Sequence, residues 1–174
     1  MFSIHSPNER NKIKKVRNMI VIKPDSLEQE CNMTSVFLAG SIEMGVCEDW
    51  QLKVSQIFYD DDVTFFNPRR DGWDSSWTQE RINKEFAHQV NWEMDSLDEC
   101  DIIFMNIIPD TKSPITLLEL GLHANSKKII VCCPDGFWRK GNVEIVCSRF
   151  NIPLYNNFEE AIEKLKQMIK NSSK

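Results

Sequence analysis

Short apolar runs alternate along this chain with longer segments in which apolar residues recur every three or four positions. The short runs are typical of buried strands, and the periodic segments are typical of amphipathic helices. Strands that alternate with helices form a parallel sheet covered on both faces. The sequence therefore predicts an α/β fold, a Rossmann-like three-layer sandwich around a mostly parallel, five-stranded sheet. We expect its strands at residues 35–39, 63–66, 101–108, 128–133 and 153–155.

The chain of 174 residues has about the length of one domain. Its first part differs from the rest, because segment 8–17 carries many basic residues and few large apolar ones. We therefore predict a partly flexible N-terminal arm over residues 1–33 and a single domain over residues 34–174. The basic segment is either solvated or a phosphate-binding arm. Residues 19–22 could add a short strand, which Pro24 would stop.

The charge balance limits the partners of the chain. Lys and Arg total 21 and Asp and Glu total 26, which gives a net charge of −5. Binding to nucleic acid without sequence preference depends on excess basic charge, so we expect no nucleic-acid partner. No run approaches the roughly 20 apolar residues of a membrane span, and the first residues lack the apolar core of a secretory signal. We expect no membrane association and a cytoplasmic location.

The cysteines and histidines do not form a recognisable metal pattern. The six cysteines include no C-x-x-C pair, and the three histidines lie far apart in sequence. We therefore expect reduced, mostly buried thiols, and neither a metal nor a cofactor.

Ligands of parallel α/β folds bind beyond the carboxyl ends of the strands, at the point where the strand order reverses. Four segments follow the predicted strands directly and are the candidates for chemistry. They are residues 40–41, 67–70, 109–113 and 134–138.

Two glutamates are the candidate catalytic groups. Glu119 lies inside the apolar segment 117–121, just after one of these strand-end segments. Burial of an unpaired carboxylate is costly, which favours a role as nucleophile or base over the alternative that Glu119 simply faces solvent. Glu93 lies one helix earlier and is either a surface residue or a second catalytic carboxylate. Two carboxylates across one cleft suit glycosidic-bond chemistry, in which one attacks the anomeric carbon and the other manages the leaving group.

The turn after the first predicted strand contains Gly40 and Ser41. Its backbone N–H groups, with the following helix N-terminus, could bind an anion, although ordinary turn formation explains these residues equally well. Glu43 follows two residues later and would repel a phosphate. The segment lacks the Gly-Lys-Ser/Thr of a Walker loop.

A polar loop follows the strand at residues 63–66. Its Arg69 and Arg70 either grip a phosphate or carboxylate of a ligand or form salt bridges within the chain, with Asp71 or Asp74. The aromatic ring of a tryptophan on such a loop either packs the loop down or stacks on a flat ligand. We expect the loop to close over the ligand and to place a tryptophan near it.

Several short motifs occur in order along the chain: residues 37–41 (FLAGS), 67–70 (NPRR), 89–93 (QVNWE), 113–121 (SPITLLELG) and 136–144 (GFWRKGNVE). The first and fourth motifs resemble those of the nucleoside 2-deoxyribosyltransferase family. The full set resembles its second branch, the nucleoside 2-deoxyribosyltransferase-like proteins, which are related to 2′-deoxynucleoside 5′-monophosphate N-glycosidases. The resemblance covers roughly residues 34–156.

This resemblance implies a flavodoxin-like fold, a homodimer or higher homo-oligomer, and a retaining attack on C1′ of a 2′-deoxynucleoside or its 5′-monophosphate. At the matching positions Glu119 would be the nucleophile, and Glu93 would contact the sugar or assist the leaving base. Ser113 matches a phosphate-binding serine of the monophosphate-cleaving relatives. Their first loop continues with Arg and Gly, whereas this chain continues with Glu43 and Met44.

The remaining matches concern substrate binding. The region around Asn142 corresponds to a segment that can reach the site of a neighbouring subunit. The expected substrate-binding residues are Gly40, Ser41, Ile42, Asn67, Arg69, Arg70, Trp73, Ser113 and Asn142.

The sequence thus favours an enzyme that cleaves or transfers at the N-glycosidic bond of a small-molecule nucleoside or nucleotide. Transfer requires that water be excluded, and hydrolysis does not. One alternative is a non-catalytic nucleotide-binding or sensor module, because one fold supports many functions. Another is hydrolysis of a dinucleotide such as NAD, whose nicotinamide bond is also N-glycosidic.

Overall fold

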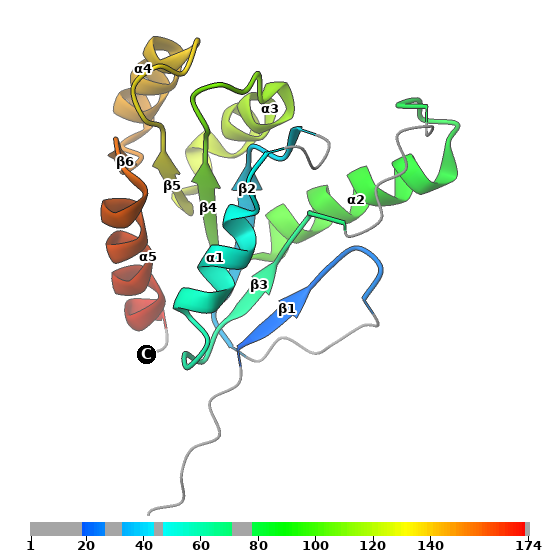
Figure 1. Cartoon of the computed structure of the whole chain (residues 1–174), viewed down its shortest axis with the longest axis horizontal. Helices are drawn as coiled ribbons and strands as arrows, with labels where there is room; N and C mark the ends of the chain where they lie inside the picture. Colours follow the sequence, from blue (N-terminus) through cyan, green and yellow to red (C-terminus); the bar gives the residue numbers. More distant parts are fainter. Residues whose placement is uncertain (1–18, 27–32, 44–46, 71–77, 173–174) are drawn as a thin grey trace, which may run out of the picture.

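The computed structural model describes residues 19–26, 33–43, 47–70 and 78–172 (Figure 1). Six strands form one sheet in the order β1-β3-β2-β4-β5-β6, and every pairing between neighbours is parallel. In chain order the elements are β1 (Ile20–Ile22), β2 (Ser35–Gly40), α1 (Trp50–Ile57), β3 (Thr64–Phe66), α2 (Lys84–Glu99), β4 (Ile102–Asn106), α3 (Pro114–His123), the short 3₁₀ helix η2 (Ala124–Ser126), β5 (Ile129–Cys132), α4 (Lys140–Phe150), β6 (Leu154–Tyr155) and α5 (Phe158–Ser172).

The predicted parallel α/β fold is confirmed, and its five strands correspond to β2 through β6. The expected strand count was one too low, because β1 pairs with β3 through Ile20 opposite Thr64 and Ile22 opposite Phe66. Residues 19–22, which the sequence marks as a possible short strand, supply this edge strand, and Ile22 is its buried residue. The described end of the N-terminal segment therefore forms part of the sheet.

Helices cover both faces of the sheet and produce the three layers. Helices α1 and α5 pack on one face, and α2, α3 and α4 pack on the other (Figure 1). Strands β2, β4 and β5 run through the middle, and nearly all of their residues are buried. Because both faces of these strands are covered, they carry continuous apolar runs rather than alternating apolar and polar residues.

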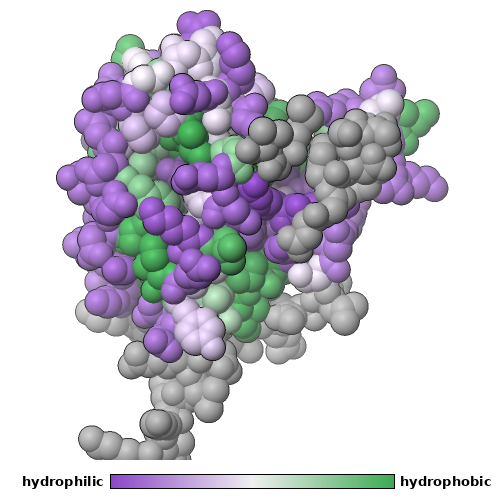
Figure 2. All heavy atoms as spheres, in the orientation of Figure 1, coloured by the Kyte–Doolittle hydropathy of each residue, from purple (hydrophilic) through white to green (hydrophobic). Residues whose placement is uncertain are grey.

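The last helix shows how sequence periodicity becomes packing. Ala161, Ile162, Leu165 and Ile169 of α5 are buried against the sheet, as their spacing predicts. The opposite side of the helix is polar, and hydrophilic residues cover much of the face seen in Figure 2. The amphipathic pattern therefore fixes which side of α5 meets the core.

The strand order places two loops next to each other. The chain leaves β2 toward β3 on one side and later enters β4 on the other side of β2. The strand order reverses at this point, so the loops that follow β2 and β4 diverge and leave room for a ligand. The segments predicted to carry chemistry, residues 40–41 and 109–113, lie at this switch point.

Gly40 ends β2 in a conformation that only glycine adopts readily. Its φ is +141°, and a Cβ placed there would lie 2.1 Å from the carbonyl oxygen of Asn106 on β4. The backbone N–H of Ser41 donates to that same carbonyl oxygen at 3.0 Å. The absence of a side chain at Gly40 therefore allows the two loops of the switch point to approach each other.

The described part of the chain contains no helix long and apolar enough to cross a membrane. All five described cysteines are free thiols, and four of them are buried, as expected. The sixth, Cys31, lies outside the described ranges.

We predict that Gly40→Ala destabilises the protein. The new methyl group would collide with backbone, and alanine would be strained at this φ, so the free energy of unfolding should fall by about 2–4 kcal/mol. Urea denaturation of the purified variant measures this change. Gly141→Ala is the matched control, because nothing lies within 4 Å of a Cβ built at Gly141. In helix α4 that change should raise stability by about 0.5–1 kcal/mol. Equal stability of the two variants would refute the prediction.

Candidate active site

Three hydroxyl groups meet at the switch point. The Oγ atoms of Ser41 and Ser113 are 2.6 Å apart, and Thr111 Oγ1 lies 2.9 Å from the first and 2.7 Å from the second. All three residues are buried. The backbone N–H of Ile108 also donates to Ser41 Oγ. These contacts fix the loop after β2 against the loop after β4, and they bring together Ser41 and Ser113, two of the predicted substrate-binding residues.

A carboxylate caps the N-terminus of α3. Glu43 Oε1 accepts hydrogen bonds from the backbone N–H groups of Lys112 at 2.9 Å and Ser113 at 3.0 Å. Ser113 itself occupies the N-cap position in a left-handed conformation and forms no side-chain cap. The N-terminus of a helix attracts negative charge, and here Glu43 supplies it from a distant part of the chain. The two backbone N–H groups just before the first residue of α3 are therefore already occupied by a carboxylate.

Glu93 is held by a neighbour on its own helix. Gln89 Nε2 donates to Glu93 Oε1 at 2.7 Å, one turn earlier on α2. Burial raises the pKa of Glu93, whereas the hydrogen bond from Gln89 and the charge of Arg70 act in the opposite direction. The Gln89 donor and the Arg70 charge both favour the ionised form, so burial and polar contacts compete at this carboxyl group.

Glu119 lies on α3 and has a different environment. Burial, and secondarily the negative charge of Glu93, raises the pKa of Glu119 to about 8. Within the described ranges no donor reaches its carboxylate. The two predicted catalytic residues therefore interact electrostatically, and the side chain of Glu119 is not fully exposed to solvent. A pKa of about 8 keeps most of Glu119 protonated at neutral pH.

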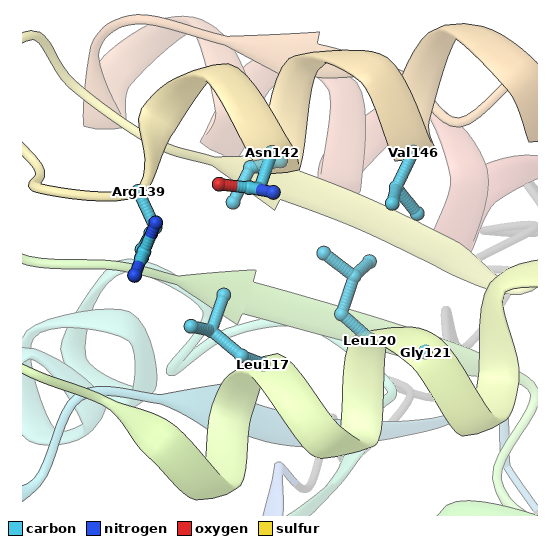
Figure 3. A pocket seen from close by; sticks show the side chains of 7 residues that line it. Leu117, Leu120, Gly121, Arg139, Asn142 and Val146 are labelled. Atoms are coloured by element: carbon cyan, nitrogen blue, oxygen red, sulfur yellow. The ribbon is translucent and has the colours of Figure 1, made fainter.

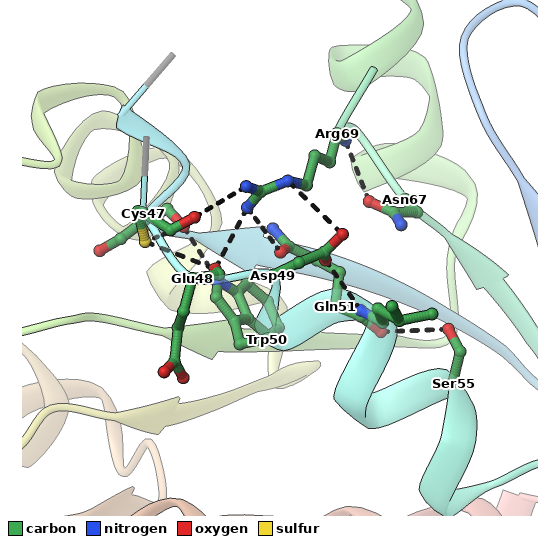
Figure 4. A network of polar contacts seen from close by, with 10 residues as sticks. Cys47, Glu48, Asp49, Trp50, Gln51, Ser55, Asn67 and Arg69 are labelled. Atoms are coloured by element: carbon green, nitrogen blue, oxygen red, sulfur yellow. Dashed lines mark hydrogen bonds and ion pairs between the residues drawn. The ribbon is translucent and has the colours of Figure 1, made fainter. Parts of the chain in front are cut away.

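Arg69 binds the loop that precedes α1 (Figure 4). Its guanidinium donates to the carbonyl oxygens of Cys47 at 2.7 Å and Glu48 at 3.2 Å, and it lies 3.7 Å from the carboxylate of Asp49. The backbone N–H of Arg69 donates to the side chain of Asn67, which is buried. Both predicted binding residues therefore hold the protein together at this edge of the site.

Arg70 is also engaged within the chain. Its Nε donates to Gln89 Oε1 at 2.5 Å, and its Nη2 lies 3.1 Å from the carboxylate of Asp25. Ion pairing of both arginines within the chain was one of the two alternatives from the sequence. The partners seen here are Asp49 and Asp25. The aspartates that the sequence suggested, Asp71 and Asp74, lie with Trp73 outside the described ranges, together with the proposed closing segment.

Asn142 lies apart from these groups. It lines a pocket of about 260 Å³ between α3 and α4, next to Arg139, Val146 and Leu117 (Figure 3). The pocket lining does not include Glu119, Glu93 or the hydroxyl cluster. Within one protomer the structure therefore does not bring Asn142 together with the carboxylates. The remaining predicted residue, Ile42, is half-buried beside Ser41.

Sequence reasoning missed three contributors. In the sequence, Gln89 is only part of motif 89–93, and Thr111 is only part of the strand-end segment 109–113. Trp138 was also missed: its Nε1 donates to the carbonyl oxygen of Lys112, and its ring lies under the Lys112 ammonium. Each of the three lies in a segment that the sequence singled out, namely residues 89–93, 109–113 and 134–138, but nothing local showed that these side chains would make the contacts.

Known proteins share the family and the fold of this chain. A family model described as nucleoside 2-deoxyribosyltransferase like matches residues 33–137. No curated protein matches the sequence. A conserved protein from Enterococcus faecalis V583 has a similar crystal structure, with a TM-score of 0.57 and 12% sequence identity. The similarity covers 78% of this chain and 99% of that one. At this identity the likeness concerns the fold.

We predict that the two glutamates titrate as a coupled pair. Because the Glu93 charge raises the pKa of Glu119, Glu93→Gln should lower the Glu119 midpoint from its value of about 8. Carbon-13 NMR of protein labelled at the glutamate carboxyl carbons follows this titration, and Glu119→Gln identifies the resonance. Glu99→Gln, an exposed change on the same helix as Glu93, should leave the midpoint unchanged. An identical midpoint in wild type and Glu93→Gln would show that the carboxylates do not interact.

Proposed function

The chain belongs to the nucleoside 2-deoxyribosyltransferase-like family, and we propose that it cleaves the N-glycosidic bond of a nucleoside and passes the sugar to a second base or to water. The observation that carries this proposal is the coupled pair of Glu93 and Glu119 beside the switch point. Glycosidic-bond chemistry with retention uses two carboxyl groups with different protonation states. Burial raises the pKa of both groups, and only at Glu93 do a hydrogen bond and a positive charge act against this rise.

In the proposed reaction Glu119 is the nucleophile. Glu93 takes the proton from Glu119, and the freed carboxylate of Glu119 forms a bond to C1′ of the sugar. The C1′–N bond breaks, its electron pair goes to the base nitrogen, and Glu93 delivers the proton to the base. Water or an acceptor base then attacks C1′ and displaces Glu119, and its proton returns to the carboxyl pair. Two displacements at one carbon retain the configuration of the sugar.

The hydroxyl cluster supports this chemistry by position. Ser41, Thr111 and Ser113 hold the loops after β2 and β4 together where α3 begins, and α3 carries Glu119. A nucleophile must be held within a fraction of an ångström of its productive place. The contacts between these buried hydroxyls supply that rigidity.

The homo-oligomer expected from the sequence stays a proposal. Ile115, Leu118 and Leu122 of α3 are each more than half exposed and lie along one side of the helix that carries Glu119. These three side chains are the apolar surface that a second copy of the chain would cover.

We predict that Glu119→Gln abolishes turnover. To identify the substrate, the protein is incubated with the common nucleosides, deoxynucleosides, their 5′-monophosphates and NAD, with and without an acceptor base. The products are separated by chromatography. On the substrate so identified, Glu119→Gln and Glu119→Ala should lose several orders of magnitude in rate, because covalent catalysis is lost. Glu99→Gln, exposed at the end of α2, should retain the wild-type rate.

Two results would contradict this assignment. Near wild-type turnover in Glu119→Ala would exclude Glu119 as the nucleophile. A nucleotide that binds but stays intact after long incubation would instead favour a sensor module.

We further propose that the substrate carries a free 5′-hydroxyl group rather than a 5′-phosphate. The carboxylate of Glu43 occupies the backbone N–H groups of Lys112 and Ser113, the groups at the start of α3 that would otherwise attract a phosphate. A phosphate brought there would meet a like charge and no free donor from this pair.

This preference predicts the behaviour of Glu43→Gly. Glycine tolerates the φ of +46° at this position, so the change vacates the two N–H groups without backbone strain. The kcat/KM for the 5′-monophosphate, relative to that for the nucleoside, should rise at least about tenfold, because two donors to an anion become available. Glu48→Gln, which removes a nearby exposed charge without vacating the donors, is the control. An unchanged ratio in Glu43→Gly would argue against this role of Glu43.

A further inference from the structure

A continuous line of polar contacts runs from the first strand to Glu93. Asp25, in the turn after β1, pairs with Nη2 of Arg70, and Nε of Arg70 donates to Gln89 Oε1. Gln89 in turn donates from Nε2 to Glu93 Oε1 and to the carbonyl oxygen of Pro68. These residues come from the segment after β1, the segment after β3 and helix α2, so the contacts join parts of the chain that lie far apart in sequence.

The direction of these hydrogen bonds is fixed by chemistry. A guanidinium has donors and no acceptor, so Arg70 must find the amide oxygen of Gln89. The amide nitrogen of Gln89 then faces two acceptors, Glu93 Oε1 and the carbonyl oxygen of Pro68. Gln89 is 5% exposed and the Arg70 side chain is 8% exposed, so water has little access to compete. The amide cannot flip without placing its nitrogen against Arg70 and its oxygen against a carboxylate.

We propose that Gln89 and Arg70 are positioning residues that hold Glu93 in one orientation and in its ionised form, ready to accept the proton of Glu119. The proposal rests on the proposed function for its meaning in catalysis. It also assigns Arg70 a task inside the protein, in place of the contact with a substrate anion that the sequence left open.

The charges around Glu93 determine in which direction its pKa changes when Gln89 or Arg70 is replaced. From the segment after β3, Arg70 faces it with a positive charge, and from α3, Glu119 faces it with a carboxyl group. On its own helix Gln89 supplies the donor. Loss of the Gln89 donor or of the Arg70 charge removes stabilisation of the carboxylate while the burial remains, so the proton should bind more tightly to Glu93.

The experiment measures the protonation of Glu93 directly, without turnover. Carbon-13 NMR of glutamate-labelled protein gives its carboxyl titration, and Glu93→Gln identifies the resonance. In Gln89→Met, which keeps the length of the side chain but has no donor, the midpoint should rise by about one pH unit. Arg70→Met should raise it by a similar amount. Gln56→Met and Arg149→Met remove the same groups from exposed positions on α1 and α4 and should leave it unchanged.

Thermal melting shows whether each variant is folded, and Arg70→Lys provides a milder test. Lysine keeps the positive charge but has no Nε to hold the Gln89 oxygen, so the midpoint should lie between those of wild type and Arg70→Met. An unchanged midpoint in folded Gln89→Met or in folded Arg70→Lys would overturn the positioning role. The expected shifts in a protein whose wild type cleaves no nucleoside would instead leave the role of these residues intact and contradict the proposed function.

Discussion

The close approach of β2 and β4 at Gly40 and Asn106 is the constraint on which the candidate site depends. Glycine at this position lets the backbone of one strand end pass directly beside the carbonyl of the other. The loops that follow are then near enough for Ser41 to contact Thr111 and Ser113 through short hydrogen bonds between hydroxyl groups. A larger residue at this point would separate the loops, and the start of α3 would lose its fixed place relative to β2.

Position on different helices gives the two carboxyl groups their different properties. Glu93 lies on α2, where Gln89 donates to it and the charge of Arg70 acts on it, whereas Glu119 lies on α3. Burial acts on both groups, but only Glu93 receives a compensating hydrogen bond and positive charge. The different surroundings of the two carboxyl groups therefore arise from the packing of two helices on one face of the sheet.

The periodicity of the sequence predicted the fold well, because strands and helices depend on local patterns of apolar residues. The predicted strand ends drew attention to Ser41 and to the segment before Glu119, whereas the roles expected of Glu93 and Ser113 came from the resemblance of motifs 89–93 and 113–121. The contacts of Glu43 with Lys112 and Ser113 span 69 and 70 positions and depend on which loops the strand order brings together. No local pattern contains that information.

The strand order also has a consequence for the behaviour of the chain in concentrated solution. An edge strand offers unpaired N–H and C=O groups to any extended segment of another molecule, and long apolar edges promote aggregation. In this sheet the longest strands, β2 and β4, are central, and the edges are β1 and β6, with three and two residues. Pro24, which lacks an N–H, follows β1 after one intervening residue. The two edge strands therefore offer few unpaired N–H and C=O groups to which a strand of another molecule could bind.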